Sequence, residues 1–225
     1  QLNHITEIKK EVNNTIESIY AKEMPGPFMS LLIDDCISNG RDYNAGGSKY
    51  NTRYIQGVGI GTITDSLVSL KYNVYDRGIF SLREIKEAMD CNFENMGEMK
   101  NALLNDTPKY GNDDDYADDV MKEVFKTFYN AVSDRDTVCG GKYRIDMLPT
   151  TCHVYFGSVT GATPNGRSAF KPLTDGISPE KGADKNGPTS VLKSASKMDH
   201  VKTGGTLLNQ KFSPAVLEGE TGIKN

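Results

Sequence analysis

The chain has 225 residues and a formal net charge of −4, with 37% hydrophobic and 25% charged residues and a mean hydropathy of −0.50. This length allows one sizeable core or two small domains. Basic residues form no stripe, so the electrostatic surface of a nucleic-acid-binding protein is missing. No apolar run approaches the roughly 20 residues that span a bilayer, and the N-terminus has no signal-peptide pattern. Because the chain starts without methionine, we expect it to be an internal piece of a longer protein.

Four cysteines are spread along the chain without the close pairs that metal centres use. None of them forms a Cys-x-x-Cys motif, so a zinc ribbon or an iron–sulfur cluster finds no support. Four thiols in a chain of this length are ordinary for a reducing compartment, which favours a cytoplasmic location. The cysteines are Cys36, Cys91, Cys139 and Cys152.

Helical periodicity dominates the first 135 residues. In the first expected helix, apolar residues recur every three or four positions from Ile5 to Ile19. Ser81 is a typical N-cap, and Glu84 completes a capping box in front of another helix. The acidic stretch 112–119 precedes a further helix, whose positive N-terminus acidic side chains stabilise. We expect helices over residues 4–22, 28–37, 54–75, 82–93 and 116–132.

The remaining residues contain two expected strands, separated by a long loop and one helix. The strands cover residues 148–156, where β-branched and aromatic residues concentrate, and residues 204–214. Between them, residues 157–188 are loop-dominated and rich in proline and glycine, and PTSVLKSASKM is expected to form a short helix. This order favours parallel pairing of the two strands in an α/β architecture.

Cys152 and His153 are adjacent in the first expected strand, which raises the possibility of a nucleophile with its base. Neighbouring residues of a strand point to opposite faces, so the two side chains could neither pair in this way nor share one metal ion. Thr151 would share a face with His153, and Thr150 would share the other face with Cys152. Either face could line a pocket; the alternative is a buried cysteine beside a histidine with ordinary hydrogen bonds.

Two further motifs have structural explanations beside functional ones. GVGIG at 57–61 lacks the spacing and the preceding strand of a dinucleotide-binding fingerprint, so close helix packing is favoured over phosphate binding. NDDDYADD at 112–119 does not match a calcium-binding loop and is more typical of a solvated helix N-terminus. The three histidines, His4, His153 and His200, are far apart and show no metal-ligand spacing.

The loop after the first expected strand ends in an arginine. Residues 163–166, Thr-Pro-Asn-Gly, are a turn sequence, because proline presets φ and Asn-Gly tolerates positive φ. Arg167 follows directly and could bind a carboxylate or a phosphate, or it could tie the loop to an acidic neighbour. Residue types and spacing alone therefore indicate an α/β segment whose site they do not define.

Six longer stretches resemble the glycyl radical enzymes, the pyruvate formate-lyase family. They are YNTRYIQGVGIGTITDSL, PKYGNDDDYAD, LPTTCHVYFG, TGATPNGR, DGISPEKGADKNGPTSVLKS and KMDHVKTGGTLLNQKF. The resemblance extends from about residue 20 to the end of the chain. Within the family, the chain looks most like the dehydratases that act on trans-4-hydroxy-L-proline.

The resemblance implies a ten-stranded α/β barrel, built from two five-stranded half-barrels and wrapped in helices. Residues 1–225 would form part of this barrel domain, with 1–135 mainly helical and 136–225 supplying barrel strands and loops. In the family, one loop inside the barrel carries a reactive cysteine in Gly-Cys-x-Glu, and another carries the radical glycine in a sequence like Arg-Val-x-Gly-Tyr. Neither motif occurs here. We therefore expect the chain to lie between these two loops and to contain no catalytic residue and no bound cofactor or metal.

The same resemblance implies an activity for the intact enzyme: removal of water from trans-4-hydroxy-L-proline to give 1-pyrroline-5-carboxylate by hydrogen-atom transfer. A radical-SAM activating enzyme would install the glycyl radical. This segment would supply barrel wall and substrate-binding groups, with Thr151 as the first candidate and Thr150 and His153 after it. Cys152 has the wrong neighbours for the radical cysteine. The intact protein is expected to be an oxygen-sensitive homodimer of an anaerobic cytoplasm, with no nucleic-acid or membrane partner.

Other functions stay open at this level. Within the family, the alternatives are formate C-acetyltransferase, which uses two neighbouring cysteines and coenzyme A, and lyases such as choline trimethylamine-lyase or glycerol dehydratase. An alternative of a different class is a non-catalytic half-barrel binding module that associates with another chain.

Overall fold

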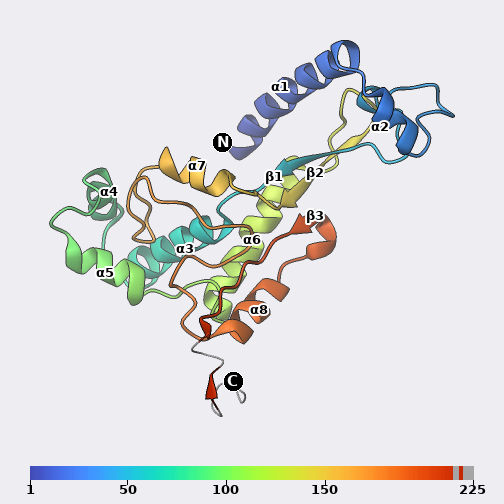
Figure 1. Ribbon diagram of the computed structural model, residues 1–225. Helices are drawn as coiled ribbons and strands as arrows, with labels where there is room; N and C mark the ends of the chain where they lie inside the picture. The colour runs from blue at the N-terminus through green and yellow to red at the C-terminus, as the bar shows by residue number, and fades with distance from the viewer. Residues whose placement is uncertain (215–217, 220–225) are drawn as a thin grey trace.

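A three-stranded parallel sheet lies at the centre of the molecule (Figure 1). The computed structural model describes residues 1–214 and 218–219. The strands β1 (Thr52–Gln56), β2 (Lys142–Met147) and β3 (Thr203–Thr206) are hydrogen-bonded in that order. Both pairs of neighbouring strands are parallel, which confirms the expected α/β class. The pairing expected between residues 148–156 and 204–214 is wrong, because the strand beside β3 is β2 and residues Cys152–Ser158 are helical.

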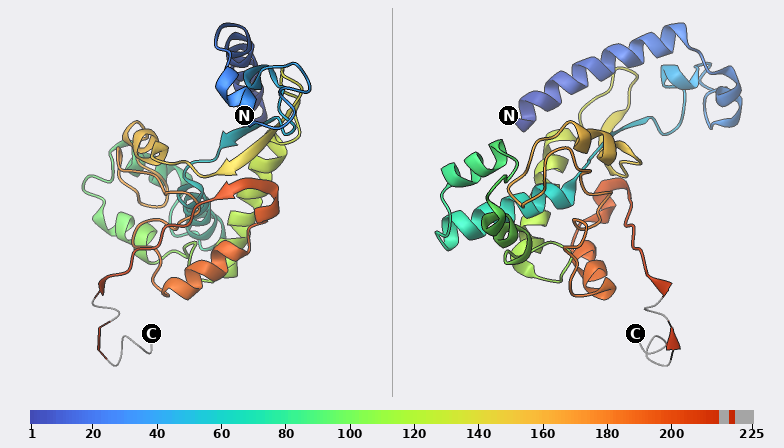
Figure 2. Two further views of the ribbon diagram at one scale, coloured as in Figure 1. Left: turned by 45° about the vertical axis from the view of Figure 1, so that its right-hand side comes forward. Right: turned by 60° about the vertical axis from the view of Figure 1, so that its left-hand side comes forward.

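Eight α-helices surround this sheet within the described residues. α1 and α2 lie at one end of the molecule, and α4 and α5 lie at the opposite end (Figures 1 and 2). α6 packs along the sheet and contacts both β2 and α3. The helices are α1 (Leu2–Glu23), α2 (Pro27–Leu32), α3 (Ile60–Leu70), α4 (Leu82–Asp90), α5 (Gly97–Asn105), α6 (Asp115–Val132), α7 (Cys152–Ser158) and α8 (Pro188–Ser196), with shorter helical turns η1 (Tyr43–Ala45), η2 (Lys71–Asp76) and η3 (His200–Lys202).

One face of the sheet is buried and apolar. Tyr143, Ile145 and Met147 alternate along β2, are at most 2% exposed, and pack in one core cluster with Met121 and Phe125 of α6. The opposite face of the same strand carries polar side chains. Parallel sheets are usually covered on both faces. The polarity of the second face therefore needs an explanation other than packing against another apolar layer.

The predicted helix starts are confirmed where capping residues mark them. The Ser81 hydroxyl accepts a hydrogen bond from the Glu84 backbone N–H at 3.2 Å, and the Glu84 carboxylate accepts one from the Ser81 N–H at 2.7 Å. Asp114 caps α6 by accepting from the Tyr116 N–H at 2.9 Å. The helices expected over 4–22 and 116–132 are present as α1 and α6.

The helix expected over residues 54–75 is wrong in its first part. Residues Thr52–Gln56 form β1, and α3 begins only at Ile60. The residue before it, Gly59, has a φ of +78°. Only glycine adopts such a backbone readily, so Gly59 separates the strand from the helix.

The close-packing interpretation of GVGIG is confirmed. A Cβ atom added to Gly57 would lie 2.7 Å from the Met147 sulfur, and one added to Gly61 would lie 2.8 Å from the carbonyl oxygen of Ser178. Both distances are too short for any side chain. The small residues thus let α3 approach β2 and the loop after α7.

The strand expected over 148–156 is wrong, because β2 ends at Met147 and residues Cys152–Ser158 form α7. Pro149 cannot donate a hydrogen bond to a strand ladder, and Thr150 has a φ of +51°, so the chain turns there. The expected strand 204–214 is also shorter, since β3 covers only Thr203–Thr206. The alternating stretch KYRIDM forms β2, a strand that was not among the expected elements.

Candidate functional site

A cleft of about 1130 Å³ lies beside the loops that follow β2 and β3. Its walls come mainly from residues 166–191 and 209–213, with His153 of α7 at one side. Loops held by a rigid scaffold frequently carry binding groups. Among the three residues expected to bind substrate, His153 lines this cleft, whereas Thr150 and Thr151 are not in its lining.

His153 lies next to a carboxylate in this cleft. Its Nδ1 atom is 3.6 Å from Asp175 Oδ1 and 3.2 Å from the carbonyl oxygen of Thr150. The other carboxylate oxygen of Asp175 accepts a hydrogen bond from the Asn209 side chain. Asp175 Oδ1 is buried and has no hydrogen-bond partner among the described residues. The cluster joins α7 to the segment that follows β3.

The helical conformation of α7 changes the expected arrangement around His153. Thr151 is the exposed N-cap residue, and the hydroxyl of Thr150 donates to the carbonyl of Pro149 at 2.7 Å. The alternation of faces assumed for a strand therefore does not apply here. Cys152 and His153 still point in different directions, because successive helix residues are about 100° apart. The structure does not bring them together as a nucleophile–base pair.

Arg167 is a buried brace for its own loop. Its guanidinium donates to the carbonyl oxygens of Gly161, Ser168 and Lys171 at 2.8–2.9 Å, and the residue is only 5% exposed. These carbonyls occupy most of the donor capacity that an external carboxylate or phosphate would need. Of the two roles left open by the sequence, bracing the loop is the one that the contacts support.

A polar cluster in the wall of the cleft is centred on Glu180, which is half-buried. Its carboxylate accepts hydrogen bonds from the hydroxyl of Thr62 at 2.8 Å and from the amide of Asn165 at 3.4 Å. Burial raises the pKa of Glu180, and the Thr62 hydrogen bond and the Arg167 charge oppose that rise. The cluster ties α3 to the loop after α7 through side chains far apart in sequence.

Asp65 of α3 and Lys109 form a second buried charged group next to this cluster. Burial raises the pKa of Asp65 to about 7, although the Lys109 charge and the backbone N–H of Tyr110, at 2.9 Å, act to lower it. Burial likewise lowers the pKa of Lys109. The Lys109 ammonium donates to the carbonyl oxygens of Leu103 at 2.7 Å and Asn165 at 3.4 Å.

Three acidic side chains of the run at 112–119 pair with the same lysine. Lys197, at the end of α8, lies 3.1 Å from Asp113, 2.8 Å from Asp115 and 2.7 Å from Asp118. The hydroxyl of Ser194 also donates to Asp118 at 2.9 Å. These acids therefore begin α6 and fasten it to α8. Within residues 1–214 and 218–219, no group of three or more His, Cys, Asp or Glu side chains could hold a metal ion.

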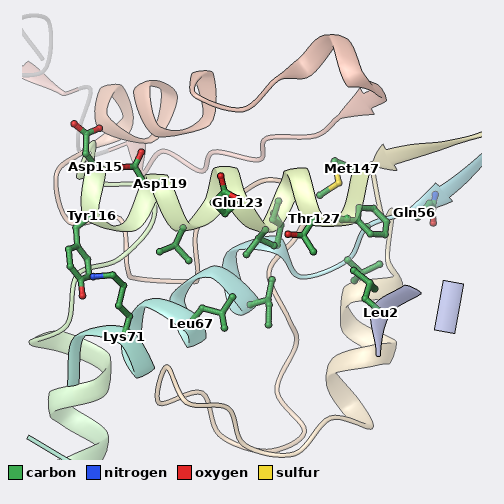
Figure 3. Close-up of a pocket in the computed structure, with 17 residues that line it drawn as sticks. Leu2, Gln56, Leu67, Lys71, Asp115, Tyr116, Asp119, Glu123, Thr127 and Met147 are labelled. Atoms are coloured by element: carbon green, nitrogen blue, oxygen red, sulfur yellow. The ribbon is translucent and has the colours of Figure 1, made fainter. Parts of the chain in front are cut away.

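A second hollow of about 790 Å³ lies between α3 and α6 (Figure 3). Its floor is apolar and includes Ile63, Leu67, Val124 and Phe128. Acidic side chains follow one rim along α6, and Lys71 stands at the end of the groove beside Tyr116, its Nζ atom 4.0 Å from the ring centroid. The apolar floor is typical of a packing surface more than of a reaction site.

The open face of the sheet carries the polar residues that the sequence analysis did not single out. Tyr54 of β1 lies opposite Arg144 of β2, and Gln56 lies opposite Asp146. Tyr54, Gln56 and Arg144 are exposed, and Asp146 is half-buried. The signal for this face was the alternation of KYRIDM, in which every second residue is polar or charged.

The matches to known families cover most of the chain. Residues 1–157 match the "Pyruvate formate lyase-like" family, and residues 173–225 match the "Glycine radical" family. The chain therefore belongs to the pyruvate formate lyase-like family, the glycyl radical enzymes, as the resemblance predicted. Its sheet and helices form part of the α/β barrel of these enzymes, which confirms the expected fold class.

Individual relatives match nearly the whole chain. The chain is 60% identical over 225 residues to trans-4-hydroxy-L-proline dehydratase of Clostridioides difficile, covering 100% of this chain and 28% of the relative. It is 35% identical over 220 residues to (2S)-3-sulfopropanediol dehydratase of Klebsiella oxytoca, covering 94% and 26%. The chain thus spans little more than a quarter of the length of these relatives.

Solved structures agree with the sequence relatives. The hydroxyproline dehydratase of C. difficile with bound trans-4-hydroxy-L-proline has a TM-score of 0.95 at 60% identity, with 100% of this chain and 28% of that chain covered. The glycerol-bound glycerol dehydratase of Clostridium butyricum has a TM-score of 0.92 at 38% identity, again covering 100% and 28%. In the described part of the chain, none of the helices has the length and apolarity for a membrane span.

Proposed function

We propose that this chain is part of a glycyl radical dehydratase that removes water from trans-4-hydroxy-L-proline and gives 1-pyrroline-5-carboxylate. The observation that carries the proposal is the 60% identity over all 225 residues to an enzyme of that name, against 32–38% for relatives with other names. The reaction balances, because the substrate equals the product plus one water. A glycyl radical installed by a radical-SAM activating enzyme supplies the hydrogen-atom chemistry.

The proposal includes the arrangement of the intact protein. Residues 1–225 belong to one barrel domain, with 1–135 mainly helical and 136–225 contributing strands and loops; β1 adds a strand to the first part. The intact enzyme is a homodimer in an anaerobic cytoplasm. This segment supplies wall and binding groups, so the 225-residue chain alone has no turnover.

Anaerobic assays of the intact enzyme with its activating enzyme and SAM test the activity. We expect consumption of trans-4-hydroxy-L-proline with formation of 1-pyrroline-5-carboxylate, and no comparable turnover of glycerol, 1,2-propanediol or isethionate. Turnover of one of those compounds in place of hydroxyproline would contradict the proposed substrate. Dehydration by the isolated 225-residue chain would contradict the assignment of its role.

We also propose that Thr151, with Thr150 and His153 beside it, contacts the substrate. The three residues follow the carboxyl end of β2, where parallel sheets place their binding groups. Thr151→Val in the intact enzyme should weaken substrate binding by roughly 1–3 kcal/mol, since a partner of the hydroxyl is left unpaired. Thr160→Val is the matched control, because that hydroxyl donates to the carbonyl of Phe156 within the same segment. Kinetics of Thr151→Val equal to those of the control would exclude Thr151.

A further inference from the structure

The open face of the sheet holds two opposite charges, Arg144 and Asp146, and the backbone of Leu148 is the hydrogen-bond partner of the Asp146 carboxylate. Arg144 is exposed and takes part in no ion pair or side-chain hydrogen bond within residues 1–214 and 218–219. Asp146 lies two residues further along the same strand and on the same face. Its Oδ1 atom is buried and accepts no hydrogen bond in this part of the structure. The two side chains do not pair with each other, although their Cα atoms are only about 6.6 Å apart by strand geometry.

An aromatic ring and two glycines surround these charges, of which Arg144 is exposed and Asp146 is half-buried. The ring of Tyr54 reaches across the sheet to β3, where a Cβ atom on Gly204 would lie 2.0 Å from the ring carbon Cε1. The next residue, Gly205, is also without a side chain, and Asp146 Oδ1 is the nearest group to the space that its Cβ would occupy, at 3.8 Å. The Tyr54 ring thus fills the space above Gly204, and Gly205 leaves room above β3 beside the Asp146 carboxylate.

Polarity separates this face from the apolar face on the other side of β2. A sheet face that packs against helices would carry valine, isoleucine or leucine. Instead, Tyr54 and Gln56 of β1 and Arg144 and Asp146 of β2 are in register across the two strands. An aromatic surface with one cationic and one anionic group is complementary to a small amino acid, which carries an anion and a cation on one carbon atom.

We propose that this face binds the zwitterionic end of the amino-acid substrate, with Arg144 donating to the carboxylate and Asp146 accepting from the ring ammonium. The proposal rests on the hydroxyproline activity proposed above and adds the groups that select an amino acid over a polyol. The planar guanidinium suits a carboxylate with two parallel hydrogen bonds. Tyr54 presents its ring to the apolar side of the pyrrolidine. Burial raises the pKa of Asp146, which an adjacent ammonium would reverse.

Binding of trans-4-hydroxy-L-proline to the intact enzyme without radical activation tests this assignment by calorimetry. Arg144→Gln and Asp146→Asn should each weaken binding roughly 10- to 100-fold, as expected for a lost hydrogen bond between charged groups. Lys142→Gln is the matched control, because Lys142 is an exposed cation on the same strand and face that pairs with Asp136 at 2.6 Å. This control should bind the substrate as the wild type does.

Two substrate analogues assign each side chain to its charge. The methyl ester of hydroxyproline lacks the carboxylate charge, so Arg144→Gln should weaken its binding little while still weakening the parent acid. The N-acetyl derivative lacks the ammonium, so Asp146→Asn should show the same pattern with that compound. A purely structural effect of either substitution would weaken the binding of the parent acid and of the analogue to the same degree.

The outcomes separate the two levels of the proposal. If the wild-type enzyme binds hydroxyproline and both variants bind it equally well, the proposed binding role of Arg144 and Asp146 is excluded while the proposed activity stands. If the wild type does not bind hydroxyproline, both the proposed activity and the proposed binding role of Arg144 and Asp146 are excluded. Because Arg144 is exposed, the Arg144→Gln variant is expected to fold. Its affinity for hydroxyproline tests the proposal even if the Asp146→Asn variant does not fold.

Discussion

Two polar regions of this molecule are built in opposite ways. Around α3, Asp65 and Lys109 are buried and Glu180 is half-buried, and their hydrogen-bond partners come from separate segments of the chain. On the open face of the sheet, Arg144 has no side-chain partner in the described residues, and the Oδ1 atom of Asp146 accepts no hydrogen bond there. Charges that find partners inside the chain hold its loops together. Charges that are left without partners on an accessible face are free to select a ligand.

The comparison predicts that substitutions in the two regions affect different measurements. Changes in the buried cluster should alter local stability, and changes on the open face should alter ligand binding with little effect on stability. A buried-cluster variant that kept its stability but lost substrate binding would break this distinction.

The largest effect is expected from Lys109→Met. The substitution leaves Asp65 without its nearby cation, and removing one partner of a buried ionic group costs about 3–5 kcal/mol. Native-state hydrogen exchange of the α3 amides in the intact enzyme measures the local opening free energy. Lys126→Met is the control, since its pair with Glu123 at 3.6 Å is exposed and contributes little. Equal exchange in the two variants would show that Lys109 does not stabilise this cluster.

The pH dependence of stability gives the next effect. The folded-state pKa of Asp65 is about 7, above its ordinary value of 3.8, so between these pH values the folded state binds a proton that the unfolded state has lost. The opening free energy of α3 should therefore fall as pH rises from about 4 to about 7 and change little above that range, by an amount on the order of a few kcal/mol. Glu180 adds a slope of the same sign, because its pKa is also raised.

Asp65→Asn isolates the contribution of that carboxyl group. The asparagine side-chain oxygen can still accept from the Tyr110 N–H, so the hydrogen bond at 2.9 Å is retained while the titration is removed. Exchange of the α3 amides measured at a series of pH values should show a smaller slope in the variant than in the wild type. An unchanged slope would mean that Asp65 does not titrate in this range.

The sequence predicted the elements that local signals define. The capping box at Ser81, the acidic start of α6 and the helix at residues 188–196 follow from residue types within one or two turns. The strands were the weak point, because TRYIQ and KYRIDM are short and their partners lie far away in the sequence. The composition of PTTCHVYFG favoured a strand, but a proline and a turn at Thr150 ended β2 before it.

The candidate site was predictable only in part for the same reason. The family resemblance drew attention to Thr151 and His153 but gave no weight to Arg144 or Asp146, whose shared face depends on the register of β1 against β2. Likewise, Arg167 could not be assigned to its own loop until the three carbonyl partners were placed around it. Long-range pairing, which no local pattern contains, decided each of these cases.

The smallest effect is expected from substitutions of the two glycines of β3, Gly204 and Gly205. Gly204→Ala would place a Cβ atom 2.0 Å from the Tyr54 ring, so the ring must move, and overpacking of this kind costs about 1–3 kcal/mol. Gly205→Ala meets only an ordinary contact with Asp146 Oδ1 at 3.8 Å and should be tolerated. Hydrogen exchange of the amides in β3 compares the two variants directly. The double variant Tyr54→Ala with Gly204→Ala should lose most of the penalty, because the clash has no ring to displace; a penalty that persisted would place the strain in the β3 backbone and not in the aromatic ring on the open face.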